Sequence, residues 1–177
     1  MGAPGEGASS LRIVVCDTGP ILHLREAGVL DVLAFAGEVI VPAAVDEELA
    51  RLVDDWASVR PSWLVRRVLH AAEAPSGPVH SGLTGLGPGE TEAILLARQV
   101  HADWLLTDDA EARLVASLAG LDVHGSLGVV LWAAASGHLD RAHTDAALKG
   151  LVGSSLWMST TIITEARTAL RKIYDQP

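Results

Sequence analysis

The chain has 177 residues, of which 49% are hydrophobic and 20% charged, as in globular proteins and unlike disordered chains. Its net charge of −9 argues against a protein that recognises nucleic-acid sequence through a basic face, but not against an enzyme that meets phosphates through metal ions. The longest apolar run, residues 129–135, is far shorter than the roughly 20 residues of a membrane helix, so we expect no membrane association.

The ends of the chain and its single cysteine set further limits. Residues 1–10 (MGAPGEGASS) lack a basic start and an apolar segment, so they predict a disordered tail and no signal peptide. Residues 11–177 are long enough to bury a core, and we expect them to form one domain. Cys16 alone excludes an intrachain disulfide, favours a cytoplasmic location and, within an apolar run, predicts a buried thiol.

The first half of the chain alternates between strand and helix patterns. Residues 12–16 (RIVVC) are short and β-branched and predict a buried strand. Pro20 then suits the first turn of a helix that Gly28 ends. The next expected elements are a short helix over 30–35, a strand over 38–41, an amphipathic helix over 43–59 and a strand over 63–69.

The second half repeats the alternation after a segment, 74–89, whose Pro, Gly and Ser residues predict a loop. Together the two halves predict an α/β fold around a parallel sheet. The five tryptophans are expected mostly in the core. The remaining expected elements are a helix over 90–100, a strand over 104–107, a helix over 110–119, a strand over 122–124, and helices over 127–136, 144–151 and 159–171.

Acidic residues follow two of the predicted strands. Asp17 follows the first strand, and Asp108 and Asp109 follow the strand over 104–107. The carboxyl ends of parallel strands meet at one edge of the sheet, where functional crevices form. Asp17 fits a helix cap and a functional carboxylate equally well. Of two consecutive aspartates, however, one can cap the next helix and the second needs another role, which favours function here.

Two predicted helices add further acids. Glu48 falls on the shoulder of the apolar stripe of its helix, whereas Glu47 points away from it. An inward carboxylate is costly without a partner, although a solvated helix edge with an ion pair to Arg51 is the alternative. Glu90 lies on the inward face of the next helix, whereas Glu92 lies nearer its polar side. A favourable interaction with the helix dipole is a sufficient alternative for Glu90.

Carboxylates gathered in this way are the ligands that Mg²⁺ and Mn²⁺ prefer, and such ions can activate water near a phosphodiester. Other chemistries lack their motifs. The histidines form no HExxH pair, and one cysteine cannot build a zinc cluster. The glycines of SGLTGLGPGE are not followed by the Lys-Ser/Thr of a phosphate loop, and no Gly-x-Ser-x-Gly elbow is present.

Four segments, taken in this order, resemble the motifs of a PIN domain: VVCDTGPILHL, VIVPAAVDEEL, LGPGETEAILLA and LLTDDAEAR. Two later segments, GSLGVVLWAAASGHL and SSLWMS, are similar to one bacterial and archaeal PIN subfamily related to VapC-type toxins. The resemblance spans about residues 12–170. It implies a Rossmann-like three-layer α/β/α sandwich whose clustered acids bind Mg²⁺ or Mn²⁺ and cleave RNA.

The resemblance also implies site residues and partners. Its metal ligands fall on Asp17, Glu48, Glu90 and Asp109, with Asp108 and Thr107 as catalytic neighbours. It implies a cytoplasmic ribonuclease that is the toxin of a toxin–antitoxin pair, with RNA as substrate, a small antitoxin protein as partner, and a homodimer. We expect the last two helices to form the dimer surface, although their apolar residues fit the domain core equally well. One feature departs from the toxins, which place an aspartate where this chain has Glu90 and Thr91.

Two residues near the predicted ligands have assigned roles. We expect Thr107 to donate to a phosphate or ligand oxygen and Arg113 to approach a phosphate, with an ion pair to Asp109 as the alternative for Arg113. Two other functions stay open for the whole chain. One is a PIN-like module that binds nucleic acid or a partner without cutting, and the other is an oligomerisation domain whose acids are only helix caps.

Overall fold

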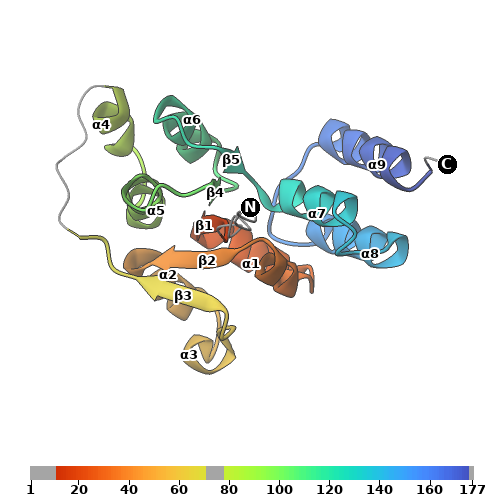
Figure 1. Cartoon of the computed structure of the whole chain (residues 1–177), viewed down its shortest axis with the longest axis horizontal. Coiled ribbons are helices and arrows are strands. Elements are labelled where there is room, and N and C mark those ends of the chain that lie inside the picture. Colours follow the sequence, from red (N-terminus) through yellow and green to blue (C-terminus); the bar gives the residue numbers. More distant parts are fainter. Residues whose placement is uncertain (1–10, 71–77, 176–177) are drawn as a thin grey trace, which may run out of the picture.

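The computed structural model describes residues 11–70 and 78–175, and a central sheet with helices on both faces dominates them (Figure 1). The tail expected over 1–10 lies outside the described residues. The strands are β1 (Ile13–Cys16), β2 (Glu38–Pro42), β3 (Leu64–Arg67), β4 (Trp104–Leu106) and β5 (Val123–His124). All of them run parallel, in the order β3-β2-β1-β4-β5. The expected α/β fold is confirmed.

The position of β1 in the sheet determines where a site can form. It lies between β2 and β4, and Val15 pairs with Ile40 on one side and Leu105 on the other. The strand order therefore reverses direction between β1 and β4, and open α/β sheets bind ligands outside the carboxyl ends at such a reversal. Asp17 directly follows β1 and Thr107 directly follows β4, so the topology places both residues beside this crevice.

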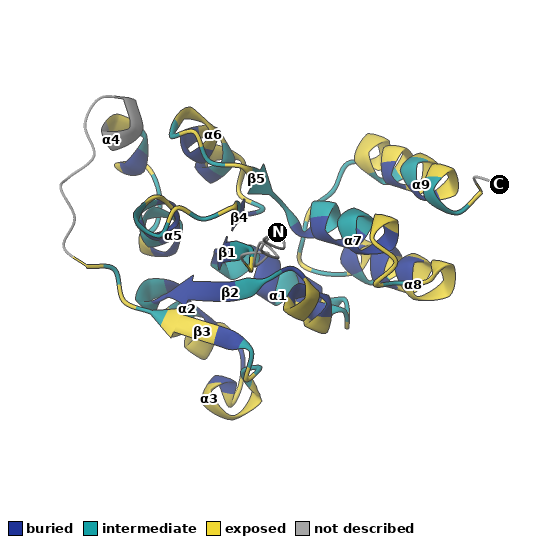
Figure 2. Cartoon of the chain, viewed as in Figure 1, coloured by how far each residue is buried: buried dark blue, intermediate teal, exposed yellow. Residues whose placement is uncertain are grey.

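Helices cover both faces of the sheet because the strands are apolar on both sides. Val14 and Cys16 belong to a core shared with α1, α2 and α7, whereas Val15 belongs to a core shared with α5 and α6. Figure 2 shows the resulting burial of the central strands. The helices are α1 (Thr18–Glu26), the 3-10 helix η1 (Leu30–Phe35), α2 (Ala43–Leu52), α3 (Trp56–Val59), α4 (Pro78–Leu83), α5 (Pro88–Gln99), α6 (Ala110–Leu118), α7 (Ser126–Ala135), α8 (Arg141–Val152) and α9 (Thr160–Tyr174).

The long helix expected over 43–59 is wrong, because α2 ends at Leu52 and the separate helix α3 follows. Asp55 between them adopts a left-handed backbone with φ 54°. This break turns the chain so that the Trp56 indole donates to Asp46 Oδ1 at 2.8 Å while its ring is buried. Leu52, which an unbroken amphipathic helix over 43–59 would place on its apolar face with Val45 and Leu49, is 59% exposed.

The loop expected over 74–89 is also only partly correct. Residues 71–77 lie outside the described residues, α4 occupies part of the rest, and α5 begins at Pro88, a residue favoured in a first helical turn. Cys16 is buried as expected, and burial raises its pKa, so the thiol stays neutral. Across 11–70 and 78–175 we find no helix with the length and apolar character needed to span a membrane.

Candidate active site

A pocket of about 470 Å³ opens at the carboxyl ends of β1 and β4. Helices α1, α2, α5 and α6 contribute to it, and the linker between α8 and α9 supplies Ser155, Leu156 and Trp157. Trp157 is 83% exposed and is the exception to the expectation that the tryptophans lie mostly in the core. Five carboxylates line this acidic pocket: Asp17, Glu48, Glu90, Asp108 and Asp109. The structure thus brings all of the predicted acids together.

Asp17 lies at the centre of a buried hydrogen-bond network and is 4% exposed. Its Oδ1 accepts from the backbone N–H of Thr18 at 2.7 Å, which makes it the N-cap of α1, and its Oδ2 accepts from Thr107 Oγ1 at 2.8 Å. Burial raises the pKa of Asp17 to about 6, although these two hydrogen bonds lower it, and the charges of Glu90 and Glu48 raise it further. Asp17 therefore both caps a helix and faces other acids.

Glu48 lines the acidic pocket, an inward position that its place on the shoulder of the apolar stripe predicted. Its Oε2 accepts from Thr18 Oγ1 at 2.5 Å, and its Oε1 accepts from the backbone N–H of Gly89 at 3.1 Å. A Cβ on Gly89 would lie 2.5 Å from Glu48 Oε2, so only glycine permits this approach. Neighbouring Glu47 is exposed. Among the described residues, no ion pair joins Glu48 to Arg51.

The two glutamates of α5 face different neighbours. Glu90 lies in the first turn of α5 and lines the acidic pocket. Glu92 was expected on the polar side, but it is half-buried and its Oε2 accepts from the backbone N–H of Ala44 at 3.0 Å. That expectation is wrong because α5 packs against α2, whose N-cap residue Pro42 offers no side-chain acceptor. Glu92 thus caps α2 from a neighbouring helix.

The two consecutive aspartates after β4 have different hydrogen-bond partners. Exposed Asp109 is the N-cap of α6, and its Oδ1 accepts from the backbone N–H of Ala112 at 2.7 Å. Asp108 contacts His23 Nδ1 at 2.7 Å and accepts from both the backbone N–H and the hydroxyl of Ser126. Burial raises the pKa of Asp108, but these hydrogen bonds outweigh it and hold the pKa below its usual range.

Sequence reasoning missed three residues of this network: Thr18, His23 and Ser126. His23 and Ser126 bond to Asp108 from α1 and α7, and Thr18 joins Asp17 to Glu48. A polar residue opening a helix beside a predicted acid was the available signal, and it applies to Thr18 alone, because Ser126 lies 18 residues from Asp108 in the sequence. His23 carried no such signal, because its position within α1 does not reveal which strand end its side chain faces.

Thr107 and Arg113 lie beside the acidic pocket. Thr107 is 1% exposed, so its hydroxyl serves Asp17 and does not face solvent. Arg113 donates from Nη1 to the backbone carbonyl of Thr107 at 3.2 Å and is not part of the pocket lining. Its alternative role, an ion pair with Asp109, is not formed among the described residues.

The carboxylates provide the right donor chemistry for a hard cation, but not a finished coordination shell. Within the described part of the chain, no group of three or more His, Cys, Asp or Glu side chains is arranged to hold a metal ion. Glu48 and Asp109 each accept a hydrogen bond from a backbone N–H group. Yet the like charges of Glu48 and Glu90 act on buried Asp17, which is the condition that a divalent cation relieves.

A parallel sheet with acids gathered at its topological reversal places the chain among α/β proteins whose sites lie at the strand ends, as the resemblance to a PIN domain predicted. A family model described as DUF3368: PIN domain matches residues 13–172, and the chain belongs to this family of PIN domains. The PIN domain is generally a nuclease fold, and its members usually bind divalent metals. The resemblance seen in the four acidic motifs is thereby confirmed.

A solved structure supports the same fold. The chain is similar to a PilT N-terminus domain protein, SSO1118, from the hyperthermophilic archaeon Sulfolobus solfataricus P2, with a TM-score of 0.51 and 15% identity. The similarity covers 66% of this chain and 89% of the archaeal protein. None of the curated proteins compared with the chain matches it significantly. At this identity the archaeal structure supports the three-layer α/β/α fold alone.

Proposed function

We propose that this protein is a ribonuclease that depends on Mg²⁺ or Mn²⁺. The observation that supports it most is a buried carboxylate, Asp17, that faces two further acids in one pocket at the carboxyl end of the sheet. Helix capping accounts for the hydrogen bond that Asp17 Oδ1 accepts, but it does not require Glu48 or Glu90 to lie nearby. Hard divalent cations take such oxygen ligands and leave coordination positions for water and substrate phosphate.

Asp17, Glu48, Glu90 and Asp109 are the proposed ligands. Each carboxylate oxygen has two lone pairs, so the hydrogen bonds that hold Asp17 and Asp109 leave acceptor capacity towards a cation. A bound ion supplies the activation of water and the neutralisation of charge on a phosphodiester. Asp108 is left as a neighbour because its three hydrogen bonds, to His23 and Ser126, already take most of its acceptor capacity.

The surrounding residues hold these ligands in place. Thr107 and Thr18 fix the orientation of Asp17, and Thr18 also holds Glu48 through its hydroxyl. Trp157 presents an exposed aromatic face at the rim, a surface on which an unpaired base stacks favourably. These features favour RNA with a single-stranded segment as the substrate.

The biological setting completes the proposal. We place the protein in the cytoplasm as the toxin of a toxin–antitoxin pair, with a small antitoxin as its partner, on the basis of its likeness to VapC-type toxins. A homodimer is part of the same proposal. Its expected surface on the last two helices has less support, because Leu148, Ala166 and Leu170 pack together within one chain.

A binding module that does not cut is the second candidate. The observations in its favour are the incomplete coordination geometry within the described residues and Glu90 at a position where toxins have aspartate. Such a protein would bind RNA and leave it intact. It differs from the nuclease in a single measurable property, phosphodiester cleavage.

The test combines metal binding with cleavage. Mn²⁺ should raise the melting temperature of the purified protein, because a ligand that prefers the folded state stabilises it. RNA should be cut in the presence of Mg²⁺ or Mn²⁺ and stay intact with EDTA. Intact RNA despite a clear Mn²⁺ shift would favour the binding module, and the absence of both effects would remove the metal site.

A further inference from the structure

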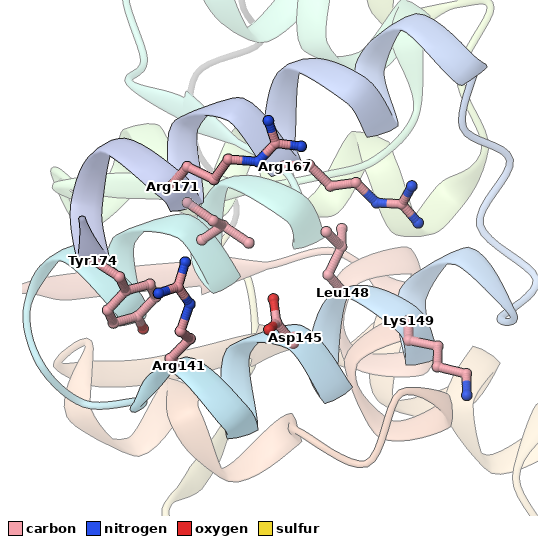
Figure 3. A pocket seen from close by; sticks show the side chains of 8 residues that line it. Arg141, Asp145, Leu148, Lys149, Arg167, Arg171 and Tyr174 are labelled. Carbon is pink, nitrogen blue, oxygen red and sulfur yellow. The ribbon is translucent and has the colours of Figure 1, made fainter.

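A second pocket, of about 410 Å³, lies between α8 and α9 (Figure 3). Four cationic side chains line it, two from each helix: Arg141, Lys149, Arg167 and Arg171. The carboxylate of Asp145 also lines it. We call this pocket the basic groove. It shares no lining residue with the acidic pocket.

The charge of the basic groove is unusual for this chain. The whole protein has 13 Lys and Arg residues and a net charge of −9, yet cations outnumber carboxylates along the groove. Arg141 forms an ion pair with Asp175 at 2.8 Å. Among the described residues, Lys149, Arg167 and Arg171 form no ion pair. Three cations therefore remain available to an anionic ligand.

The floor of the groove is already packed. Leu148 and Leu170 are 4% and 5% exposed and belong to the small core that joins α7, α8 and α9. Tyr174 fixes the end of α9, since its hydroxyl donates to the Leu139 carbonyl at 2.9 Å and contacts Thr144 Oγ1 at 2.7 Å. A ligand would meet this surface without any movement of the helices.

The chain connects the basic groove to the acidic pocket. Residues 153–159 join α8 to α9, and Ser155, Leu156 and Trp157 within this linker line the acidic pocket. Lys149 lies in the last turn of α8, next to the linker. From Lys149 the helix runs back eight residues, about 12 Å, to Arg141. A polymer that leaves the acidic pocket across the linker would reach the groove at its Lys149 end.

We propose that the basic groove binds the phosphates of an RNA strand whose scissile bond lies in the acidic pocket. The inference rests on the proposed ribonuclease function and identifies where the substrate gains affinity. Five carboxylates around the cleavage site repel a polyanion, so attraction must come from elsewhere on the surface. Cations that contact phosphates provide it by releasing counterions, independently of sequence.

The test removes three cations and compares the loss with a matched control. Lys149, Arg167 and Arg171 are changed together to Gln in an Asp17→Asn background, so that RNA is bound without being cut. The control triple, Arg25→Gln, Arg51→Gln and Arg98→Gln, removes the same charge from exposed positions on α1, α2 and α5. Melting curves verify that both variants are folded. Binding of a fluorescent single-stranded RNA is then measured over a range of salt concentrations.

The groove variant should bind RNA about tenfold or more weakly, and its salt slope should fall by about 2, since each single-strand phosphate contact contributes about 0.7. The control triple should change the affinity by less than about twofold, because distant surface charges are screened. Equal losses in the two triples, or no loss in either, would overturn the proposal. The proposal is also overturned if the groove variant still binds RNA but no longer binds polyglutamate, because the groove would then be a site for acidic peptide and not for RNA.

A second measurement separates the groove from the nuclease function. With Asp17 restored, the groove variant should cleave a dinucleotide at the wild-type rate, because so short a substrate does not reach the groove. For a long RNA its KM should rise while kcat stays unchanged. If wild-type protein cuts neither substrate but the binding loss is confined to the groove variant, the ribonuclease proposal fails and the phosphate-binding groove stands. Loss of dinucleotide cleavage would contradict the separation of the two sites.

Discussion

The acidic pocket and the basic groove are built in opposite ways. The acidic pocket joins residues far apart in the sequence, such as Asp17 and Thr107, through buried hydrogen bonds at strand ends. The basic groove lies between two consecutive helices (Figure 3). Its cations are exposed side chains, whereas Leu148 and Leu170 on its floor are buried. Single substitutions should therefore have large effects in the pocket, whereas the groove should respond only to several changes made together.

The largest effect is expected at Asp17. Asp17→Asn keeps the shape of the side chain but removes the buried charge towards which Glu48 and Glu90 converge. Cleavage should fall by at least about a hundredfold, the upper range seen when even outer partners of a metal site are lost. The Mn²⁺-induced rise in melting temperature should also disappear. Glu47→Gln on the exposed face of α2 is the control and should behave as wild type.

The pH dependence of the metal-free protein provides a second test of the acidic pocket. The pKa of Asp17 is raised from 3.8 to about 6, so the folded state holds its proton more tightly than the unfolded state. The free energy of unfolding should therefore increase as the pH falls from 7 towards 4, by roughly 2–3 kcal/mol. Denaturant titrations in EDTA measure it.

Asp108 affects the same titration in the opposite direction. Its pKa is lowered, so its stabilisation is present above the unfolded value of 3.8 and is lost as the pH falls through the folded value. The rise between pH 7 and 4 thus belongs to Asp17 and should vanish in Asp17→Asn. A rise of the same size in that variant would assign the effect to another group.

Gly89 tests how closely α5 must approach Glu48. In Gly89→Ala the new Cβ would lie 2.5 Å from Glu48 Oε2, so the carboxylate or the helix must shift. We expect weaker Mn²⁺ binding with only a small loss of stability, because the atoms that must move are the carboxylate end of a flexible side chain. Gly128→Ala in α7 is the control, because its Cβ would meet only His124 at ordinary distances, the nearest at 3.8 Å. Similar losses in both variants would show that the close approach is unimportant.

The sheet and the acidic strand ends were predictable because they depend on local patterns. Residues 12–16 and 38–41 are short, apolar and β-branched, and both form strands close to the expected bounds. The position of Glu48 followed from its angle on the helix. The end of α2 did not, because the break at Asp55 depends on where Trp56 finds Asp46 in the folded chain. The contact between Trp56 and Asp46 cannot be predicted from the pattern of apolar residues along the helix.

The same limit applies to the network around the acids. The hydrogen bonds from His23 and Ser126 to Asp108 join α1 and α7 to a strand end, and they form only once those helices pack. The cap that Glu92 provides to α2 likewise depends on the packing of α5 against α2. The sequence thus predicted which acids meet, whereas their division into caps, partners and proposed ligands required the fold.

The smallest expected effects distinguish Glu90 from Glu92, and here the structure changes the expectation. Both lie in α5, but Glu90 faces the acidic pocket and Glu92 caps α2 through Ala44. Glu90→Gln removes a like charge near Asp17, so the metal-free protein should become slightly more stable while Mn²⁺ binding weakens.

Glu92→Gln should have the reverse pattern. Its amide oxygen can still accept from the backbone N–H of Ala44, but the negative charge at the start of α2 is lost, which costs about 0.3–1 kcal/mol. Mn²⁺ affinity should stay at the wild-type value, since this carboxylate points away from the acidic pocket. Melting curves of the two variants, recorded with and without Mn²⁺, measure both effects. The change in metal-free stability should have opposite signs in the two variants. If both substitutions destabilise the metal-free protein and leave Mn²⁺ binding unchanged, Glu90 is a helix-stabilising acid and not a metal ligand.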